Sequence, residues 1–265
     1  MTVIHDTAWV SPQADVAPDV EIGPYCVIYE NTVIGAGTVL HNNVTVFPRT
    51  AIGTRNRIFP GASLGGAPQD LKYKGGQTRL EVGDDNVIRE CVTMNAGTEK
   101  GGGITRVGSR NLFMACSHVA HDCQFADDII VGNNVLPAGH VTVGRKVVLS
   151  GGCAMHHFTT IGEFAFVGGL TRIVHDVPPY MITEGNPSKV RAVNVVGMQR
   201  GGFDETVVEQ MREAYRLLFM TGKKFSRKQA VKKILDWPDP CKQVRYLVDF
   251  LQASEGGKHG RQHQP

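Results

Sequence analysis

Residues 22–46 read IGPYCVIYENTVIGAGTVLHNNVTV, and an aliphatic residue stands at every sixth position of this stretch. The same spacing extends in both directions without a break, from Ile4 to Leu64. The positions are Ile4, Val10, Val16, Ile22, Ile28, Ile34, Leu40, Val46, Ile52, Ile58 and Leu64. A period of six fits neither the 3.6-residue repeat of an α-helix nor the alternation of a half-buried strand. It indicates an internal structural repeat.

The repeat returns further along the chain, after two segments that lack it. It covers Val82, Ile88 and Met94, slips by one residue, and then runs from Val107 to Pro179 with few interruptions. The fifth place of each hexad is mostly filled by small residues or valine. Two inward positions per hexad describe an 18-residue coil with three flat faces, which is a parallel β-helix. We therefore expect a mainly β fold in which stacked coils bury a central aliphatic column.

The repeat predicts a β-helical domain in residues 1–190 and a different structure in residues 191–265. Two segments interrupt the coils, at 66–79 (GAPQDLKYKGGQTR) and 95–106 (NAGTEKGGGITR), and we expect both to be loops outside the prism. The coils are expected to end near Pro187. Beyond Gly202 the apolar residues take helical spacing, with Asp204 and Ser226 as N-caps and Pro240 at the start of a third helix. The C-terminal part is thus predicted to be α-helical, with a frayed end at 255–265.

Basic residues are concentrated in the predicted helices. Residues 203–265 hold 12 Lys and Arg against 8 Asp and Glu, whereas the rest of the chain holds 16 against 17. This pattern fits either a dock for an acidic partner or an ordinary solvated face. The residues are Arg212, Arg216, Lys223, Lys224, Arg227, Lys228, Lys232 and Lys233. The formal net charge of the whole chain is only +3, which argues against an unspecific nucleic-acid binder.

Other features of the sequence bear on the cellular compartment. No apolar run approaches the ~20 residues that cross a bilayer, and the N-terminal MTVIHDTAWVSP lacks the order of a secretory signal. We therefore expect a cytoplasmic protein with no membrane span. The six cysteines form no CxxC pair and are expected to be buried, reduced thiols. They are Cys26, Cys91, Cys116, Cys123, Cys153 and Cys241.

A cluster of histidines is the main candidate for chemistry. It contains His118, His121, His140, His156 and His157. Spacings of 19 and 17 residues place His121, His140 and His157 at similar points on successive 18-residue coils, stacked along one edge. Asp122 follows His121, and a neighbouring carboxylate fixes the tautomer of an imidazole and stabilises its charged form.

The residue types favour direct acyl transfer to a hydroxyl. An imidazole that titrates near neutrality suits proton removal from a sugar hydroxyl. No GxSxG elbow or comparable Ser or Cys nucleophile motif is present, so a covalent acyl-enzyme is not required. Direct transfer also needs an oxyanion donor, and the Ala138-Gly139-His140 turn offers a backbone N–H that no side chain obstructs.

The strings QDLKY (69–73), HVAHDC (118–123), AGHV (138–141) and DVPPY (176–180) occur in this order within the hexapeptide domain, before the C-terminal helices. Together they resemble the acyl-carrier-protein-dependent UDP-N-acetylglucosamine O-acyltransferases, over essentially the whole chain. The resemblance implies a left-handed β-helix and a homotrimer with its sites in clefts between adjacent prisms. It implies transfer of a fatty acyl group, expected to be 3-hydroxylated, from acyl carrier protein to UDP-N-acetylglucosamine at the first step of lipid A biosynthesis. We expect no metal and no other cofactor.

The resemblance also implies roles for individual residues. His121 matches the base that deprotonates the glucosamine 3-hydroxyl, Asp122 the residue that orients it, and Gly139 the oxyanion donor. The positions expected to bind substrate are Gln69, Asp70, Lys72, His118, His140, His156, His157, Gly169, Asn194 and Arg200. Of these, Asn194 and Arg200 match nucleotide-sugar contacts. Gly169 matches the position that limits acyl length, where a glycine leaves room for a longer chain.

The chain departs from the usual residues of the family at four positions. It has Asn95 in place of His, His157 in place of Gln, Val196 in place of Glu and Gly201 in place of Arg. Val196 and Gly201 remove a carboxylate and a cation from the nucleotide end, which leaves open a 3-amino relative of UDP-N-acetylglucosamine as acceptor. The His-Asp pair and the glycine turn are kept, so the reaction class is expected to be kept.

Three other functions are compatible with parts of the pattern. The N-acyltransferase later in the same pathway usually carries a globular domain before its prism, whereas the hexads here begin at Ile4. A hexapeptide-repeat zinc hydratase needs three histidines on one metal, which the cluster could imitate. It explains neither the QDLKY segment nor the helical tail. A scaffold without catalysis is the third alternative, since many solenoids only bind.

Overall fold

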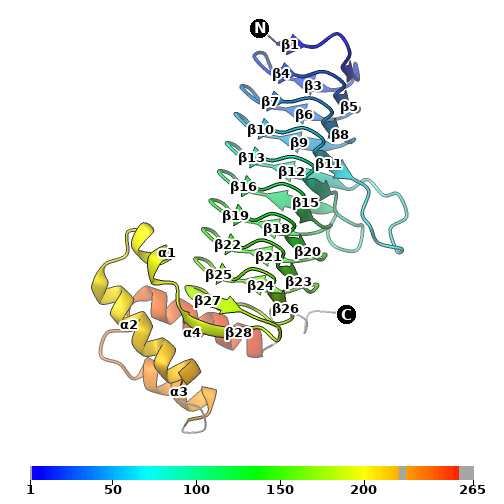
Figure 1. Cartoon of the computed structure of the whole chain (residues 1–265). Coiled ribbons are helices and arrows are strands. Elements are labelled where there is room, and N and C mark those ends of the chain that lie inside the picture. Colours follow the sequence, from blue (N-terminus) through cyan, green and yellow to red (C-terminus); the bar gives the residue numbers. More distant parts are fainter. Residues whose placement is uncertain (1, 221–224, 257–265) are drawn as a thin grey trace.

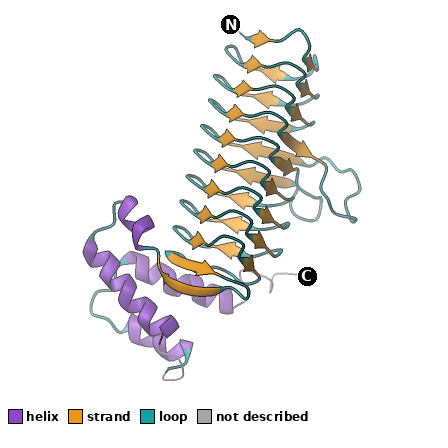
Figure 2. Cartoon of the chain, in the orientation of Figure 1, coloured by secondary structure: helices purple, strands orange, loops and turns teal. Residues whose placement is uncertain are grey.

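The computed structural model describes residues 2–220 and 225–256, and it shows a prism of stacked coils with helices at one end (Figure 1, Figure 2). The prism is a left-handed parallel β-helix, so the predicted fold class is confirmed. Within the described residues the strands form three faces, which the chain visits in turn. Most strands therefore pair with the strand three places further along the chain; the exceptions are the break between β17 and β20 and the final strands from β24 onward.

The strands are short, and the bounds of each follow by face. The first face consists of β1 (Val3–Ile4), β4 (Glu21–Ile22), β7 (Val39–Leu40), β10 (Arg57–Ile58), β13 (Val87–Ile88), β16 (Leu112–Phe113), β19 (Ile130–Val131), β22 (Val148–Leu149), β25 (Phe166–Val167), β27 (Met181–Glu184) and β28 (Lys189–Val193). The second face consists of β2 (Trp9–Val10), β5 (Val27–Ile28), β8 (Thr45–Val46), β11 (Ser63–Gly66), β14 (Thr93–Asn95) and β17 (His118–Val119), followed by β20 (Leu136–Pro137), β23 (Ala154–Met155) and β26 (Arg172–Ile173). The third face consists of β3 (Asp15–Val16), β6 (Val33–Ile34), β9 (Thr50–Ile52), β12 (Arg79–Val82), β15 (Ile104–Val107), β18 (Gln124–Phe125), β21 (Thr142–Val143) and β24 (Thr160–Ile161).

The central column predicted from the six-residue period is present. Ile22, Ile28 and Ile34, one from each face, are at most 2% exposed, and the column continues through the later coils. The fifth place of the hexad is buried as well, for example at Cys26. Ile4 is an exception at 45% exposed, because no coil covers it at the open N-terminal end.

Each corner of the prism is a tight turn that contains a residue in the left-handed conformation. These residues recur every six positions, and many are not glycine, for example Tyr25 (φ 59°), Asn31 (φ 57°) and Asn43 (φ 58°). A non-glycine residue in this region costs about 1 kcal/mol or more. The repeated hydrogen bonds between coils, such as that from the Asn43 N–H to the Pro24 carbonyl at 3.0 Å, hold the turns in place.

The two predicted loops are present, and both are shorter than predicted. The first spans residues 67–78, between β11 and β12, and the second spans residues 96–103, between β14 and β15. Both leave the same corner of the prism, between the second and third faces (Figure 1). The predicted ends of the second loop are strand, because Asn95 belongs to β14, and Ile104–Val107 pair with β12.

The C-terminal part contains the predicted helices and one that the sequence did not indicate. Its helices are α1 (Val195–Arg200), α2 (Glu205–Tyr215) with a π-helical turn at Arg216–Met220, α3 (Arg227–Leu235) and α4 (Lys242–Glu255). Asp204 precedes α2 as predicted, but its side chain makes no cap hydrogen bond. Ser226 caps α3 in a reciprocal pair with Gln229. The six-residue α1 was missed because it is too short to show a period.

The end of the prism is covered by these helices. β27 and β28 form an antiparallel hairpin that follows the last coil, and apolar residues of α2, α3 and α4 form a second core against it. The Ser254 hydroxyl of α4 also lies 2.6 Å from the Asp176 carboxylate of the last coil. β28 spans residue 190, and the division into domains of residues 1–190 and 191–265 stays a prediction. Of the end predicted to fray, at 255–265, Glu255 is the last residue of α4 and Gly256 is its C-cap, and residues 257–265 lie outside the described part of the chain.

The prediction that the cysteines are buried is wrong for two of them. Cys91 and Cys116 are exposed, because both occupy left-handed corner positions whose side chains face away from the core. Cys241 is partly exposed, and Cys26, Cys123 and Cys153 are buried as expected.

Candidate active site

The predicted catalytic residues lie at the corner from which both loops leave. In the coils that follow the loops, Asp122, His140 and Phe158 occupy the same corner position, with φ angles of 62°, 64° and 65°. Their coils are held in register by hydrogen bonds from the His140 N–H to the His121 carbonyl (3.0 Å) and from the Phe158 N–H to the Gly139 carbonyl (3.2 Å). The corner therefore collects side chains from several coils at one edge.

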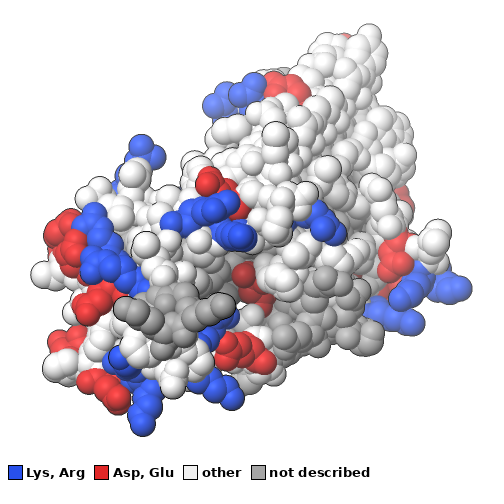
Figure 3. Space-filling view, turned by 60° about the horizontal axis from the view of Figure 1, so that its bottom comes forward, with Lys and Arg blue, Asp and Glu red and all other residues white. Residues whose placement is uncertain are grey.

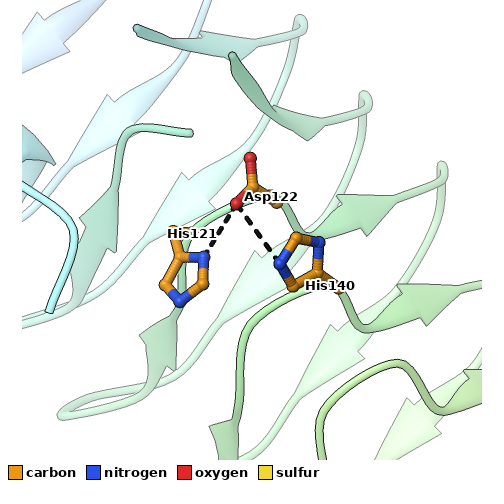
Figure 4. A group of neighbouring side chains, drawn as sticks. All are labelled: His121, Asp122 and His140. Atoms are coloured by element: carbon orange, nitrogen blue, oxygen red, sulfur yellow. Dashed lines mark hydrogen bonds and ion pairs between the residues drawn. The ribbon is translucent and has the colours of Figure 1, made fainter. Parts of the chain in front are cut away.

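His121 and Asp122 form a buried, hydrogen-bonded pair (Figure 4). Nδ1 of His121 lies 2.8 Å from Oδ2 of Asp122, and the two side chains are 9% and 1% exposed. A carboxylate at Nδ1 favours the tautomer that carries its proton there, which leaves Nε2 as an acceptor. The pair can therefore present a base through Nε2 of His121.

The second loop completes the surroundings of Asp122. The backbone N–H of Thr98 donates to Oδ1 of Asp122 (2.8 Å), and the Thr98 hydroxyl donates to Oδ2 (2.7 Å). The Asp122 N–H donates to the Thr105 hydroxyl at 2.8 Å. A Cβ atom added to Gly101 would lie 2.1 Å from the carboxyl carbon of Asp122, so the loop backbone passes directly over the carboxylate. Sequence reasoning missed Thr98 and Gly101 of the loop and Thr105 of β15; the glycine run at 101–103 is the signal for such a close approach.

These contacts hold the charge on Asp122. Burial alone would raise the pKa of Asp122, but the hydrogen bonds from His121 and Thr98 outweigh it and lower that pKa below its ordinary value. Asp122 is thus an ionised carboxylate at neutral pH, although it is almost fully enclosed.

His140 lies beside this pair, but not in the column that the spacing predicted. It stacks on Asp122, whereas the position that stacks on His121 is Gly139. Nε2 of His140 is 3.6 Å from Oδ2 of Asp122, and its ring is perpendicular to that of His121 with centroids 5.3 Å apart. The ring of Phe158 stacks on the other side of His140 at 4.4 Å. The prediction of a single histidine column is therefore corrected to two adjacent columns.

Three of the histidines around His121 have a lowered pKa, which favours their neutral forms. Burial lowers the pKa of His118 and of His140, and in His140 it outweighs the opposing effect of the Asp122 charge. Partial desolvation likewise lowers the pKa of the largely exposed His157, assisted by the neighbouring His156. Neutral imidazoles can both donate and accept hydrogen bonds, which suits contacts with hydroxyl groups.

Gly139 is required by the ring that it faces. A Cβ atom there would lie 2.4 Å from Cε1 and 2.6 Å from Nε2 of His121. The His121 ring can therefore occupy this space only because Gly139 has no side chain. No acceptor among the described residues takes the Gly139 N–H, which leaves it available to a ligand.

Pro137 interrupts the second face directly beside this turn. β17 and β20 are neighbours in space but belong to separate sheets of the described chain, because Pro137 has no N–H to donate across the ladder. The ladder of the second face is thus interrupted next to the point where His121 and Gly139 face each other.

Of the substrate residues expected on the first loop, Asp70 lies near the histidines. Gln69 and Lys72 are exposed, and the Asp70 carboxylate accepts the Lys72 N–H at 2.9 Å. The negative charge of Asp70 opposes the burial effects that lower the pKa of His140 and His157, so this carboxylate lies within electrostatic reach of both. The two loops are joined by a hydrogen bond of 2.7 Å from the Gly76 N–H to the Glu99 carboxylate.

The remaining predicted histidines flank the same corner. Nδ1 of His118 lies 2.7 Å from the Thr93 hydroxyl, and the His118 ring is partly exposed. His156 is partly exposed and His157 is exposed, with ring centroids 5.5 Å apart. All five histidines of the predicted cluster therefore belong to this region of the prism.

Three predicted residues lie elsewhere in the chain. Gly169 is in an exposed turn between β25 and β26, at the corner between the first and second faces. Asn194 caps α1: its carbonyl oxygen accepts the Gly197 N–H, and its amide donates to the Phe164 carbonyl at 2.8 Å. Arg200 is the last residue of α1, which stands on the opposite side of the prism from the two loops (Figure 1). One chain alone does not bring Asn194 and Arg200 to His121.

The basic residues of the helices are only partly free. Figure 3 shows Lys and Arg interspersed with Asp and Glu over the helical end of the molecule. Arg212 and Arg216 contact Glu209, and Arg227 lies 3.6 Å from Glu255. The Lys233 ammonium lies over the ring of Phe225.

Two lysines remain as the best candidates for a docking surface. Lys228 and Lys232 line a groove of about 370 Å³ between α3 and α4, with Val231 and Leu235 as its apolar wall. Lys223 and Lys224 lie outside the described residues.

The site also has the spacing of a metal cluster. Ligand atoms of His121, Asp122 and His140 all lie within 4.8 Å of one another. However, Oδ2 of Asp122 already accepts hydrogen bonds from His121 and Thr98. Zinc hydratases of the carbonic anhydrase type use three histidines, whereas this cluster has two and a carboxylate. The arrangement favours proton transfer over metal binding. That the enzyme works without a metal stays a prediction.

Comparisons with known proteins agree with this geometry. A family model described as bacterial transferase hexapeptide (six repeats) matches residues 1–36. A second, described as UDP N-acetylglucosamine O-acyltransferase, domain 2, matches residues 176–259. The coiled prism and its His-Asp edge thus define a hexapeptide-repeat transferase. Within residues 2–220 and 225–256, no helix combines the length and apolarity needed to cross a bilayer.

Individual relatives narrow the class to one family. The acyl-[acyl-carrier-protein]–UDP-N-acetylglucosamine O-acyltransferase of Thiobacillus denitrificans is 46% identical over 257 residues, which cover 97% of this chain and 99% of that relative. The solved structure of a UDP-N-acetylglucosamine acyltransferase from Bacteroides fragilis has a TM-score of 0.92 and 36% identity, and the match covers 96% of this chain and 98% of that one. That of the O-acyltransferase from Moraxella catarrhalis has a TM-score of 0.90 and 40% identity, over 95% and 97%. The chain belongs to this O-acyltransferase family, and the resemblance predicted from its residues is confirmed.

Proposed function

We propose that the protein transfers a fatty acyl group from acyl carrier protein to the 3-hydroxyl of UDP-N-acetylglucosamine, the first step of lipid A biosynthesis. The names of the curated relatives support both substrates. The observation that carries the proposal is the buried pair in which Asp122 holds Nδ1 of His121 at 2.8 Å and leaves Nε2 as the base.

In the proposed mechanism the acceptor hydroxyl attacks the thioester directly. Nε2 of His121 takes the proton of the 3-hydroxyl as its oxygen bonds to the thioester carbonyl carbon. The carbonyl oxygen becomes an oxyanion, which the Gly139 N–H stabilises. Collapse of the tetrahedral intermediate breaks the carbon–sulfur bond, and the thiolate takes the proton from the His121 imidazolium. Asp122 stabilises that imidazolium while it exists.

The acyl group is proposed to be 3-hydroxylated, with a length that Gly169 does not restrict. A Cβ atom at Gly169 would meet only the Gly151 carbonyl, at 3.4 Å, so the exposed turn is open. This supports the sequence-based expectation of a longer chain.

The proposed nucleotide contacts require a second copy of the chain. Asn194 and Arg200 lie on the opposite side of the prism from His121, so they reach the site only from a neighbouring protomer. A homotrimer of parallel prisms, as the resemblance implies, places one protomer's α1 beside the next protomer's loops. The exposed Val196 then faces the nucleotide. Gly201 accommodates the Phe164 ring, since a Cβ atom there would lie 2.5 Å from it, so no arginine fits without displacing that ring.

The decisive experiment follows the product and the base together. Mass spectrometry of the reaction of UDP-N-acetylglucosamine with a mixture of acyl carrier protein thioesters identifies the acyl group that is transferred. The 3-amino analogue, offered in parallel, tests the acceptor.

His121→Ala is expected to lower turnover at least ~100-fold, the usual scale for loss of a general base. A folded His121→Ala protein with near-normal turnover would exclude this role. The cytoplasmic location expected from the sequence stays a prediction.

A further inference from the structure

A separate cavity lies where the helices meet the prism. It has a volume of about 330 Å³ and is lined by Arg145, Glu163, Tyr180, Lys242, Gln243 and Tyr246, among others. Arg145 and Glu163 belong to turns between the third and first faces, whereas the His121 site lies between the second and third faces. The cavity is thus at a different corner from His121, on the side of the prism that carries Asn194 and Arg200.

The N-terminus of α4 opens at this cavity without a cap. The Cys241 side chain makes no cap hydrogen bond, and no acceptor among the described residues takes the N–H groups of Lys242, Gln243 or Val244. The first turn of a fourteen-residue helix therefore presents free donors and the positive end of its dipole. Such a terminus attracts an anion.

Gln243 provides an independent sign of a missing ligand. The residue is only 6% exposed and lines the cavity, yet its side-chain amide has no hydrogen-bond partner within the described residues. Because no group of the described chain bonds to this amide, it is available to a polar molecule in the cavity.

The other charges at the cavity leave it positive. Glu163 is neutralised, because Arg145 lies 2.6 Å from one of its oxygens and the Tyr180 hydroxyl donates to the other. Burial, and then this hydrogen bond to Glu163, raise the pKa of Tyr180, so the phenol stays protonated. The Lys242 ammonium has no ion pair in the described chain. Lys242 and the end of α4 therefore determine which ligand is attracted.

We propose that this cavity binds a phosphate group. The cavity offers more hydrogen-bond donors than a carboxylate could use, namely the N–H groups of the first turn of α4, the Gln243 amide and the Lys242 ammonium. A phosphate has more acceptor oxygens for them. The volume also leaves room for an organic group attached to the phosphate, with Tyr246 as an aromatic wall. The source is either inorganic phosphate or a phosphomonoester, and the site is independent of the proposed acyl transfer.

Binding can be measured without reference to activity. Isothermal calorimetry on the full-length protein would use inorganic phosphate and glycerol 3-phosphate as probes, at constant ionic strength set with chloride. Saturable binding is expected, together with a rise in thermal stability that follows ligand concentration. The probe that binds more tightly identifies the source of the phosphate.

Variants locate the binding. The double variant Lys242→Met/Gln243→Leu is expected to raise the Kd at least ~10-fold. If this variant does not fold, Gln243→Glu replaces it in the experiment. It adds a negative charge at the cavity and is expected to raise the Kd by a similar factor. Lys189→Met removes an exposed cation elsewhere and should leave the Kd unchanged. Arg200→Ala tests whether the probe instead occupies the proposed nucleotide site. The proposal is wrong if neither probe binds, if the cavity variants bind as well as the wild type, or if Arg200→Ala alone abolishes binding.

Discussion

Gly139→Ala is the substitution that most directly tests the geometry of the site. The added methyl group would lie 2.4 Å from Cε1, 2.6 Å from Nε2 and 2.9 Å from Nδ1 of His121. Ordinary contacts of this kind begin near 3.4 Å, so the ring must move by about 1 Å. The chain itself shows that alanine suits this turn position, since Ala115 occupies it at another corner. The cost therefore comes from the ring and not from the backbone.

The displacement predicts two separate effects. A misplacement of about 1 Å at a reacting group lowers kcat/KM on the order of 100-fold. The overlap also destabilises the fold by about 1–3 kcal/mol, the usual cost of an added methyl group in a packed site. The activity loss should appear in kcat more than in KM, because the base moves while the substrate contacts remain.

The assay combines steady-state kinetics with urea unfolding. Gly151→Ala is the matched control: it holds the same turn position two corners further along the chain, and the atom nearest to its Cβ would be the Asn133 carbonyl oxygen, at 3.3 Å. The double variant Gly139→Ala/His121→Ala should regain most of the lost stability, because the clash requires the ring. If Gly139→Ala folds and keeps kcat within about threefold of wild type, or if its instability persists without His121, the reasoning is refuted.

Three further predictions follow from contacts of the same site and of the helices. Thr98→Val removes the hydrogen bond from the Thr98 hydroxyl to Asp122 but keeps the one from the backbone N–H. Since a hydrogen bond to a charge contributes about 1.5–3 kcal/mol, kcat/KM should fall roughly tenfold or more. Thr98→Ser keeps the hydroxyl and should keep the activity, so equal activity of the two variants would contradict this role. Burial places the folded pKa of His140 below its ordinary value of 6.5, so the unfolded chain binds the proton first and the free energy of unfolding should decline as pH falls below 6.5. His140→Gln should flatten that decline in urea titrations at several pH values; an unchanged slope would assign it to other groups. Reversal of charge at Lys228 and Lys232 should raise the KM for acyl carrier protein and weaken its salt dependence, and an unchanged KM would leave these lysines as an ordinary solvated face.

The prism could be predicted from the sequence because its six-residue period is visible in the order of the aliphatic residues. Every sixth residue from Ile22 to Leu64 is buried, so the pattern and the packing have the same repeat. The same register also determines which side chains stack at the active-site corner. A strict step of 18 pairs His121 with Gly139 and Asp122 with His140, as the structure has it. It also assigns Cys91 to an outward corner.

The parts that could not be predicted lie outside the repeat. Thr98 and Gly101 belong to a loop whose path is set by its contacts with Asp122, and no periodicity in the chain specifies such contacts. The helix α1 is short and is held by Asn194 against the Phe164 carbonyl, which is a tertiary contact between distant segments. In both cases the structure depends on a single long-range hydrogen-bond network, which propensity and spacing do not encode.

A comparison within one coil shows what the loop contributes. Asp122 and Asp128 are six residues apart and have the same left-handed turn conformation, with φ angles of 62° and 60°. Asp128 stays 33% exposed, pairs with Arg110, and has its pKa lowered mainly by that pair. Asp122 is 1% exposed and has no cationic side chain against it except the neighbouring histidines when they are protonated. The repeat thus supplies the same backbone at both corners, and the covering loop with Thr98 is what turns one of the two carboxylates into a buried partner for His121.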